Sequence, residues 1–297
     1  MSGPEPSYLL KFQRALKHMQ ELNSAIEGWV TDPDHYESFF DPNPDSTDEL
    51  FLKVTAKEPL RAYPISLILG DVIQDFRSSL EHLAFALALA HTKPMTDEIA
   101  RNSQFPIVGD VNSKGVAGSG EVMFDSQRAK LIGAIHPDAQ AIIKFFQPYQ
   151  SGAPFREHPL WWLSELPNID KHRLVHVVVT SIDGIDFFPE RSNEWQQPES
   201  GAVGFYPWRA ITRETVVARI RRSAFFREGK MDVKIRPSLT IALPGEPAQS
   251  VSDVLGDIRR TIETIFGQAG GQAGYLKVIH ANNYRLQSAV SSSILLP

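Results

Sequence analysis

One polar stretch of an expected long helix holds the residues best suited to acid–base and phosphate chemistry. The segment Gly70–Leu83 contains Arg77 and His82, with four residues between them. A histidine titrates near neutral pH and can act as a general base or acid. An arginine can clamp a phosphate through two parallel hydrogen bonds. The pair could cleave RNA by attack of a 2′-hydroxyl on the adjacent phosphate, which needs neither a thiol nor a metal.

The geometry of a regular helix limits how these two residues can cooperate. With Asp71 set at 0°, Arg77 lies at about 240° and His82 at about 20°, so they are about 140° apart. They can share one site only through the reach of the arginine side chain or across the symmetry axis of a dimer. A homodimer would supply such an axis.

The Arg-x4-His spacing resembles the motif of the HEPN superfamily, helical proteins that include many metal-independent ribonucleases of toxin and defence systems. The resemblance implies that Arg77 and His82 of two subunits converge on RNA in a dimer cleft. His82 would act as base or acid and Arg77 as the phosphate clamp. The supporting residues of this hypothesis are Asp170, His172 and Arg173. It involves no cofactor and no metal.

A wider pattern resembles a family of uncharacterised bacterial proteins. It combines an Arg-x-x-Leu-(Asp/Glu)-His-Leu helix, a Phe-Pro-Ile loop at 105–107 and an Asp-Lys-His-Arg motif at 170–173. The resemblance covers roughly residues 65–180 and assigns no activity by itself.

Metal chemistry is a second hypothesis for the same helix. One polar stripe of it carries carboxylate, hydroxyl and imidazole groups, at Asp71, Asp75, Ser78 and His82. A second expected helix offers His172 and His176, which face the same way because they are four residues apart. Facing helices can gather such groups around a divalent transition metal. The candidate ligands are Asp71, Asp75, His82, His172 and His176. A third hypothesis treats the stripe as structural and the protein as a non-catalytic binding or scaffold protein.

The composition excludes several classes of site. The 297 residues include no cysteine, so disulfides, thiol nucleophiles and thiolate-bound metals are ruled out. The chain contains no phosphate-binding P-loop, no dinucleotide-binding glycine motif, no zinc-protease motif and no nucleophile elbow. Histidine, arginine and carboxylates remain as the groups that could carry chemistry.

Charge is distributed unevenly along the chain. The net charge is −5, yet residues 209–236 hold nine Lys/Arg and three acids, a local net of +6. With Trp208, Phe225 and Phe226 nearby, this segment could bind RNA or another polyanion. The alternative is that the basic residues keep the edges of a sheet soluble.

Apolar periodicity predicts the elements that must position these residues. Helices are expected at 7–25, 64–90, 125–135, 137–147, 159–177 (with a kink or break at Pro167) and from Ser250 or Ser252 to Gly267. Strands are expected at 50–56, 177–179, 185–188, 203–208, 215–220 and 233–242. The Asp- and Pro-rich residues 31–48 are expected to form a loop.

Segregation of helices from strands predicts an α+β fold. We expect a helical layer around helix 64–90, then an antiparallel sheet of four to six strands and a C-terminal helix. The expected regions are a helical one (1–177), a β-rich one (178–267), and a Gly-rich linker and tail (268–297). Charges interrupt the apolar stretch 65–90, so we expect no membrane span. The N-terminus lacks a signal-peptide pattern, and a cytoplasmic location is the simplest expectation.

Overall fold

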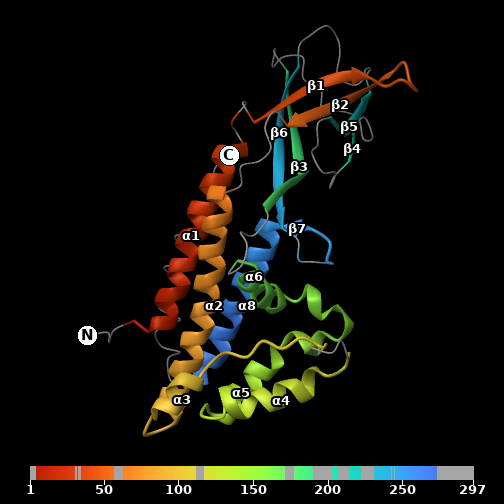
Figure 1. Ribbon diagram of the computed structural model, residues 1–297. Coiled ribbons are helices and arrows are strands. Elements are labelled where there is room, and N and C mark those ends of the chain that lie inside the picture. Colours follow the sequence, from red (N-terminus) through yellow and green to blue (C-terminus); the bar gives the residue numbers. More distant parts are fainter. Residues whose placement is uncertain are drawn as a thin grey trace. The chain divides into compact units, whose positions relative to one another are not determined.

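The computed structural model describes residues 5–30, 32, 35–56, 63–111, 117–170, 177–189, 203–206, 214–221, 231–241, 243 and 245–272. They belong to two compact units, each assembled from separate stretches of chain. A helical unit combines 1–18, 70–173 and 254–297, and a β unit combines 19–69 and 174–253. The expected α+β class is confirmed (Figure 1). The units are discontinuous, unlike the contiguous regions expected, because β1 and β2 precede α2 in the chain and α8 follows the β strands.

Most helices of the described residues match expected ones, but α3 was not expected and α4 begins and ends earlier than the helix expected at 125–135. Their bounds are α1 Ser7–Val30, α2 Tyr63–His91, α3 Asp97–Asn102, α4 Gly120–Leu131, α5 Pro137–Phe145, α6 Pro159–Asp170 and α8 Val251–Gln272. Two short 3-10 turns, η1 Pro148–Ser151 and η2 Ala153–Glu157, connect α5 to α6.

Helix α2 buries the apolar stripe that its sequence predicts. The stripe residues are each at most 4% exposed, namely Ile65, Leu69, Phe76, Leu80, Leu83 and Leu87. Burial of one such side chain stabilises a fold by about 1.5–3 kcal/mol, so this stripe holds the helix firmly in its layer. The polar face of α2 is left to form contacts of other kinds.

In the helical unit, aromatic contacts join α1 to both α2 and α8. The ring centroids of Tyr8 and Phe266 are 5.0 Å apart, those of Phe12 and Phe76 5.7 Å, and those of Phe12 and Phe266 5.4 Å. The whole expected apolar face of α8 is buried, from Val251 to Phe266. The three helices therefore share one core (Figure 1).

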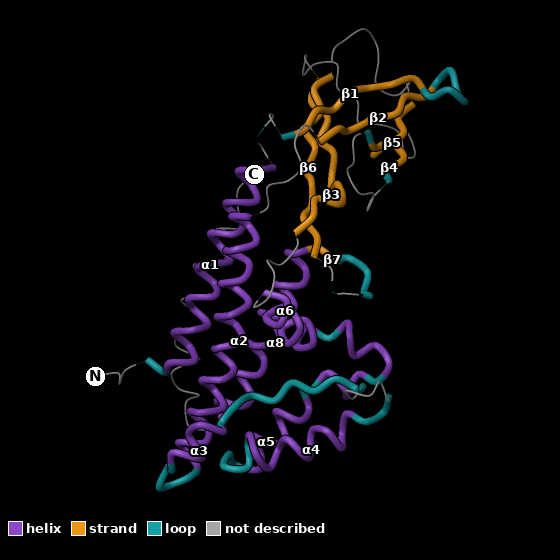
Figure 2. The backbone as a smooth tube through the Cα atoms, viewed as in Figure 1, coloured by secondary structure: helices purple, strands orange, loops and turns teal. Residues whose placement is uncertain are grey.

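The segment after α3, residues 103–111, has no regular secondary structure over most of its length. Figure 2 shows it as a long open stretch that crosses the helical unit between α3 and α4. Phe105, Pro106 and Val108 are nevertheless buried. This stretch, called here the Phe105 segment, contains the Phe-Pro-Ile loop identified in the sequence.

The β unit holds two antiparallel sheets. One has the order β1-β2-β5-β4 and the other β3-β6-β7. The strand bounds are β1 Tyr36–Pro42, β2 Glu49–Ala56, β3 Val177–Pro189, β4 Val203–Phe205, β5 Thr215–Arg221, β6 Met231–Ile241 and β7 Gln249–Ser250. The expected strand 50–56 joins the first sheet, where Leu52 pairs with Ala218 across β2 and β5.

Four expected elements differ from the structure. The expected loop 31–48 contains β1, whose aromatic residues pair with β2 through contacts that are distant in sequence. Two expected strands at 177–188 form one strand, β3, because β6 pairs along its whole length across two register shifts. The expected helix 159–177 ends at Asp170 within the described residues, and β3 begins at Val177. Helix α8 continues past Gly267 to Gln272, since no left-handed turn ends it there.

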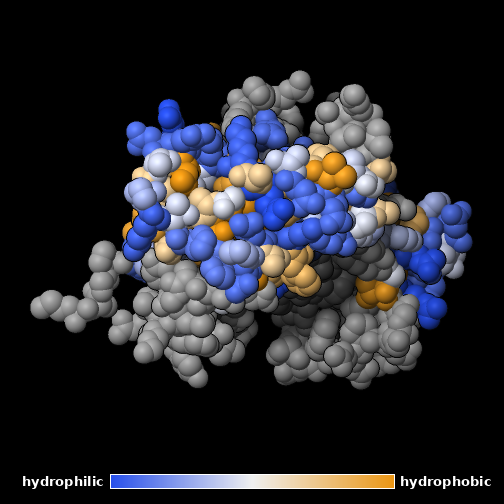
Figure 3. All heavy atoms as spheres, turned by 90° about the horizontal axis from the view of Figure 1, so that it is seen from below, coloured by the Kyte–Doolittle hydropathy of each residue, from blue (hydrophilic) through white to orange (hydrophobic). Residues whose placement is uncertain are grey.

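Among the described residues, every helix is too short or too polar to span a lipid bilayer. The face of the molecule seen in Figure 3 is mostly hydrophilic, with apolar side chains in separate small patches. Single exposed apolar residues of this kind, such as Val122 and Phe145, are normal on a protein surface.

The first testable prediction concerns two glycines. A Cβ at Gly120 would lie 2.2 Å from Tyr149 Cβ and 2.9 Å from the Gly109 carbonyl oxygen, whereas a Cβ at Gly267 would meet nothing within 4 Å. Gly120→Ala should lower the free energy of unfolding by about 2 kcal/mol or more through overpacking. Gly267→Ala should raise it by about 0.5–1 kcal/mol, because alanine favours a helix interior. Urea unfolding of both variants checks this, and equal effects would contradict it.

Candidate functional site

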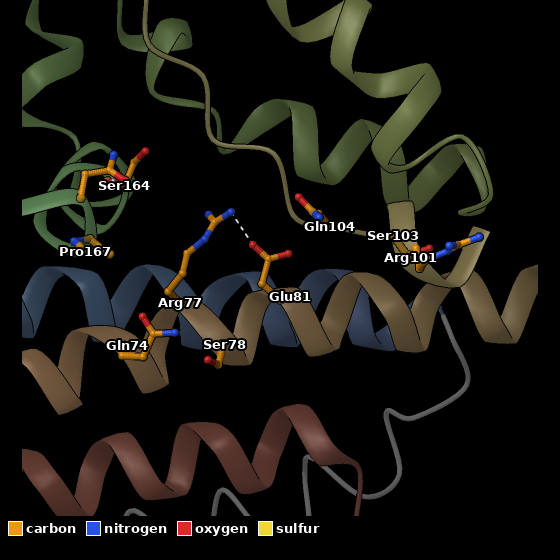
Figure 4. A pocket seen from close by; sticks show the side chains of 10 residues that line it. Gln74, Arg77, Ser78, Glu81, Arg101, Ser103, Gln104, Ser164 and Pro167 are labelled. Atoms are coloured by element: carbon orange, nitrogen blue, oxygen red, sulfur yellow. Dashed lines mark hydrogen bonds and ion pairs between the residues drawn. The ribbon is translucent and has the colours of Figure 1, made fainter. Parts of the chain in front are cut away.

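A polar pocket of about 580 Å³ lies in the helical unit against the polar face of α2 (Figure 4). Helix α2 contributes two amide or hydroxyl side chains and one ion pair, while α3, the Phe105 segment and α6 supply the other walls. The lining residues are Gln74, Arg77, Ser78, Glu81, Arg101, Ser103, Gln104, Ser164, Pro167 and Asn168. Of the two residues proposed to cleave RNA, Arg77 lines this pocket and His82 does not.

Arg77 and Glu81 together hold the backbone of the Phe105 segment. The two side chains form an ion pair one helical turn apart. Arg77 Nη2 donates a hydrogen bond of 2.9 Å to the Phe105 carbonyl oxygen, and the Phe105 N–H donates one of 2.8 Å to Glu81 Oε2. The pair thus supplies both the donor and the acceptor that a neighbouring strand would give to a residue in a sheet.

The other terminal nitrogen of Arg77, Nη1, differs from Nη2 in its contacts. Arg77 Nη1 is buried and makes no hydrogen bond within the described part of the chain. Burial lowers the pKa of Arg77 from its usual 12.5, and the contact with Glu81 opposes this shift. Arginine stays protonated at neutral pH, so the pocket wall carries a positive charge with one unused N–H group.

Gln147 continues the same support further along the Phe105 segment. Its side chain is fully buried, accepts a 2.9 Å hydrogen bond from the Val108 N–H and donates one of 2.9 Å to the Pro106 carbonyl. It also donates to the Ile143 carbonyl at 3.0 Å. Backbone groups that have no partner strand are therefore satisfied by one amide side chain.

The polar stripe of α2 does not act as one group. Asp71 is exposed, Ser78 lines the pocket, and His82 is half-buried outside it. The buried carboxylate of Asp75 faces α1, where its oxygens lie 3.4 Å from Lys11 Nζ, 3.4 Å from Arg14 Nε and 3.2 Å from His18 Nδ1. These contacts make Asp75 part of the α1–α2 interface.

The structure describes three of the five candidate metal ligands, Asp71, Asp75 and His82. Among the described residues, no group of three or more Asp, Glu or His side chains is placed to hold a metal ion. His172 and His176 lie outside the described residues, as does Arg173, and the side chain of Asp170 is not described. Half of the basic segment 209–236, residues 209–213 and 222–230, is also outside them. One of its residues that is described, Arg219, lies 3.5 Å from Glu49 in the first sheet.

The sequence reasoning missed Glu81, Gln147 and Gln104 as site residues. The i, i+4 spacing of Arg77 and Glu81 was a visible signal for their ion pair. Within the described residues, Glu81 is the acidic partner of Arg77. Gln147 carried no signal, because its partners lie about forty residues earlier in the chain.

Helix α6, one wall of the pocket, begins with a histidine cap. His158 Nδ1 accepts a 3.2 Å hydrogen bond from the Leu160 N–H, directly before Pro159 at the first helical position. Burial lowers the pKa of His158 from 6.5. It also raises the pKa of Glu165 on the same helix, an effect that Arg156 opposes. On α6, Trp162, Leu163 and Leu166 are buried, and Trp161 is half-buried.

The second testable prediction is that Gln147→Met destabilises the protein by about 3 kcal/mol. The change keeps the volume but leaves the Val108 N–H and the Pro106 carbonyl buried without a partner, at about 1–3 kcal/mol each. Gln140→Met is the matched control, because the half-buried Gln140 serves only the Ile135 carbonyl. It should cost less than about 1 kcal/mol. Unfolding in urea measures both, and equal losses would refute the role of Gln147.

The third testable prediction concerns pH. The capping nitrogen must be unprotonated, and the folded-state pKa of His158 is below the unfolded value of 6.5. The contribution of His158 to stability is therefore full above about pH 6.5 and is lost as the pH falls toward the folded-state pKa. His158→Asn retains a cap that does not titrate. Between pH 7.5 and pH 5, wild type should lose more unfolding free energy than the variant, and parallel profiles would contradict this.

Comparisons with known proteins return no relative for this chain. No protein-family model, no curated protein and no solved structure matches it.

Proposed function

We propose that this protein is a non-catalytic binding protein, and that the Arg77 pocket receives an anionic group of its ligand. The observation that carries the proposal is the guanidinium on the pocket wall. Glu81 and the Phe105 carbonyl engage part of it, while Nη1 is buried and has no hydrogen-bond partner in the described residues. Nη1 itself is closed to solvent, but the Arg77 side chain is 24% exposed, so its positive charge would attract an oxygen of a bound anion, which would reach Nη1 once the side chain turns.

The charged side chains of the pocket sum to a positive charge, which suits an anionic ligand. Glu81 balances Arg77, and the exposed Arg101 on α3 adds a further positive charge. In the part of the chain that the structure describes, Arg101 is held only by a hydrogen bond of 3.2 Å from Nε to the Asp97 carbonyl. Its terminal amine groups can therefore turn toward an anion without breaking an ion pair.

A HEPN-like ribonuclease stays a second proposal, with Arg77 as the phosphate clamp. Because His82 lies outside the pocket, this mechanism requires the His82 of a second copy to reach the RNA at Arg77. The homodimer, the cytoplasmic location and the RNA or polyanion surface at 209–236 remain predictions that belong to this second proposal.

The fourth testable prediction follows the pocket by NMR during titration with inorganic phosphate. Saturable shifts are expected for the amide signals of Ser78 and Gln104 in the wild type. Arg101→Glu should weaken binding about tenfold, since a reversed charge near the anion costs about 1.4 kcal/mol at close range. Arg128→Glu makes the same charge change at an exposed residue on α4 outside the pocket and should leave the affinity unchanged.

Equal weakening by the two charge reversals, or no saturable shift, would refute the proposed site. A cleavage assay separates the second proposal. RNA cleavage by the wild type that is lost in a folded His82→Ala variant would contradict a non-catalytic role and support the ribonuclease. Absence of cleavage in both proteins agrees with binding alone.

A further inference from the structure

We infer that the ligand of the Arg77 pocket is a small polyhydroxylated molecule with one anionic group, of the class of sugar phosphates. This inference rests on the proposed anion site and adds the chemistry of the rest of the ligand. It is drawn from the uncharged groups of the pocket wall, which outnumber the charged ones: Gln74, Ser78, Ser103, Gln104, Ser164 and Asn168.

Most of these groups are available to a ligand. Ser103 Oγ is engaged with the Ile99 carbonyl at 2.7 Å, and Asn168 Nδ2 with the Ser164 carbonyl at 3.1 Å. The side-chain amides of Gln74 and Gln104 make no hydrogen bond within the described residues, and the same is true of the Ser78 hydroxyl. Each of these side chains can both donate and accept. Ligand hydroxyl groups have the same double capacity, so they match this wall better than groups that only accept.

The available groups stand on different walls. Gln74 and Ser78 project from α2, Ser164 lies on α6, and Gln104 lies on the segment after α3 (Figure 4). A ring that carries hydroxyl groups around its edge can address several walls at once, which a linear anion cannot. The volume of about 580 Å³ is within the range of small-molecule sites.

The same wall argues against a nucleobase or an apolar ligand. The lining residues include no aromatic side chain, and Pro167 is the sole member without a polar side chain. Bases of single-stranded RNA are usually recognised by stacking on aromatic rings, a surface that this pocket lacks. Apolar ligands need a mainly hydrophobic lining, which is absent from it as well.

The fifth testable prediction compares four probes by calorimetry and NMR on the full chain: glucose 6-phosphate, inorganic phosphate, glucose and adenosine monophosphate. Glucose 6-phosphate should bind at least about tenfold more tightly than phosphate, because hydroxyl contacts add to the anion contact. Glucose should bind more weakly than glucose 6-phosphate, since it lacks the anionic group. Adenosine monophosphate should bind less tightly than glucose 6-phosphate, because it offers fewer hydroxyl groups and its base has no aromatic ring in the pocket to stack on.

A pocket variant and a matched control variant test whether the two glutamines of the pocket bind the sugar hydroxyl groups. The double variant Gln74→Ala/Gln104→Ala should weaken the binding of glucose 6-phosphate several-fold more than it weakens the binding of phosphate, and equal weakening of both would contradict the inference. Both side chains are exposed, so the fold should tolerate the change. Gln20→Ala, an exposed amide on α1 outside the pocket, is the matched control and should change neither affinity.

The outcomes separate the two proposals. If phosphate and glucose 6-phosphate both fail to bind, the proposed anion site is wrong. If phosphate binds and glucose 6-phosphate binds no more tightly, the anion site stands and the sugar-phosphate inference is overturned. Tightest binding by adenosine monophosphate would also overturn it, in favour of a nucleotide ligand.

Discussion

The helical unit depends on how it satisfies a buried stretch of backbone that belongs to no sheet. Buried N–H and carbonyl groups require partners, and a segment outside helices and sheets cannot provide them from its own backbone. Here three side chains substitute for a neighbouring strand. Arg77 and Glu81 address both polar groups of Phe105, and Gln147 addresses Val108 and Pro106. The pocket forms where these hydrogen bonds hold the Phe105 segment beside α2.

This arrangement gives the Arg77–Glu81 pair two roles at once. A buried ion pair contributes little net stability unless further hydrogen bonds satisfy its atoms, and the Phe105 backbone provides two of them. The remaining amine group of Arg77 is not satisfied by the described protein. A group required by the fold therefore also brings positive charge to the pocket, which links the architecture to the proposed binding of an anion.

Local patterns in the sequence were sufficient for the helices and for the α+β class. The stripes of α2 and α8 repeat every three or four residues, and every residue named for them is buried. Strand β1 was missed because turn-forming Asp and Pro residues surround it, while its stability comes from pairing with β2. Arg77 was identified from its chemical type. Glu81 was a neighbour on the same helix, but the Phe105 segment, Gln104 and Gln147 meet α2 only through long-range packing, which no local pattern records.

In the Phe105 segment, different groups fix its position and line the pocket. Hydrogen bonds to its backbone fix the position, and the side chain of Gln104 lines the pocket. The side chains of Arg77, Glu81 and Gln147 hydrogen-bond to its backbone N–H and carbonyl groups. These backbone groups do not depend on the side chain at a position. Gln104 is exposed to the pocket, and its own backbone N–H is bonded to the Leu131 carbonyl. A different side chain at position 104 would therefore change the chemistry of the pocket while leaving the frame in place. The backbone of the segment stays in place while the side chain at position 104 can vary. A new ligand preference can therefore arise at this position without a change in the helices.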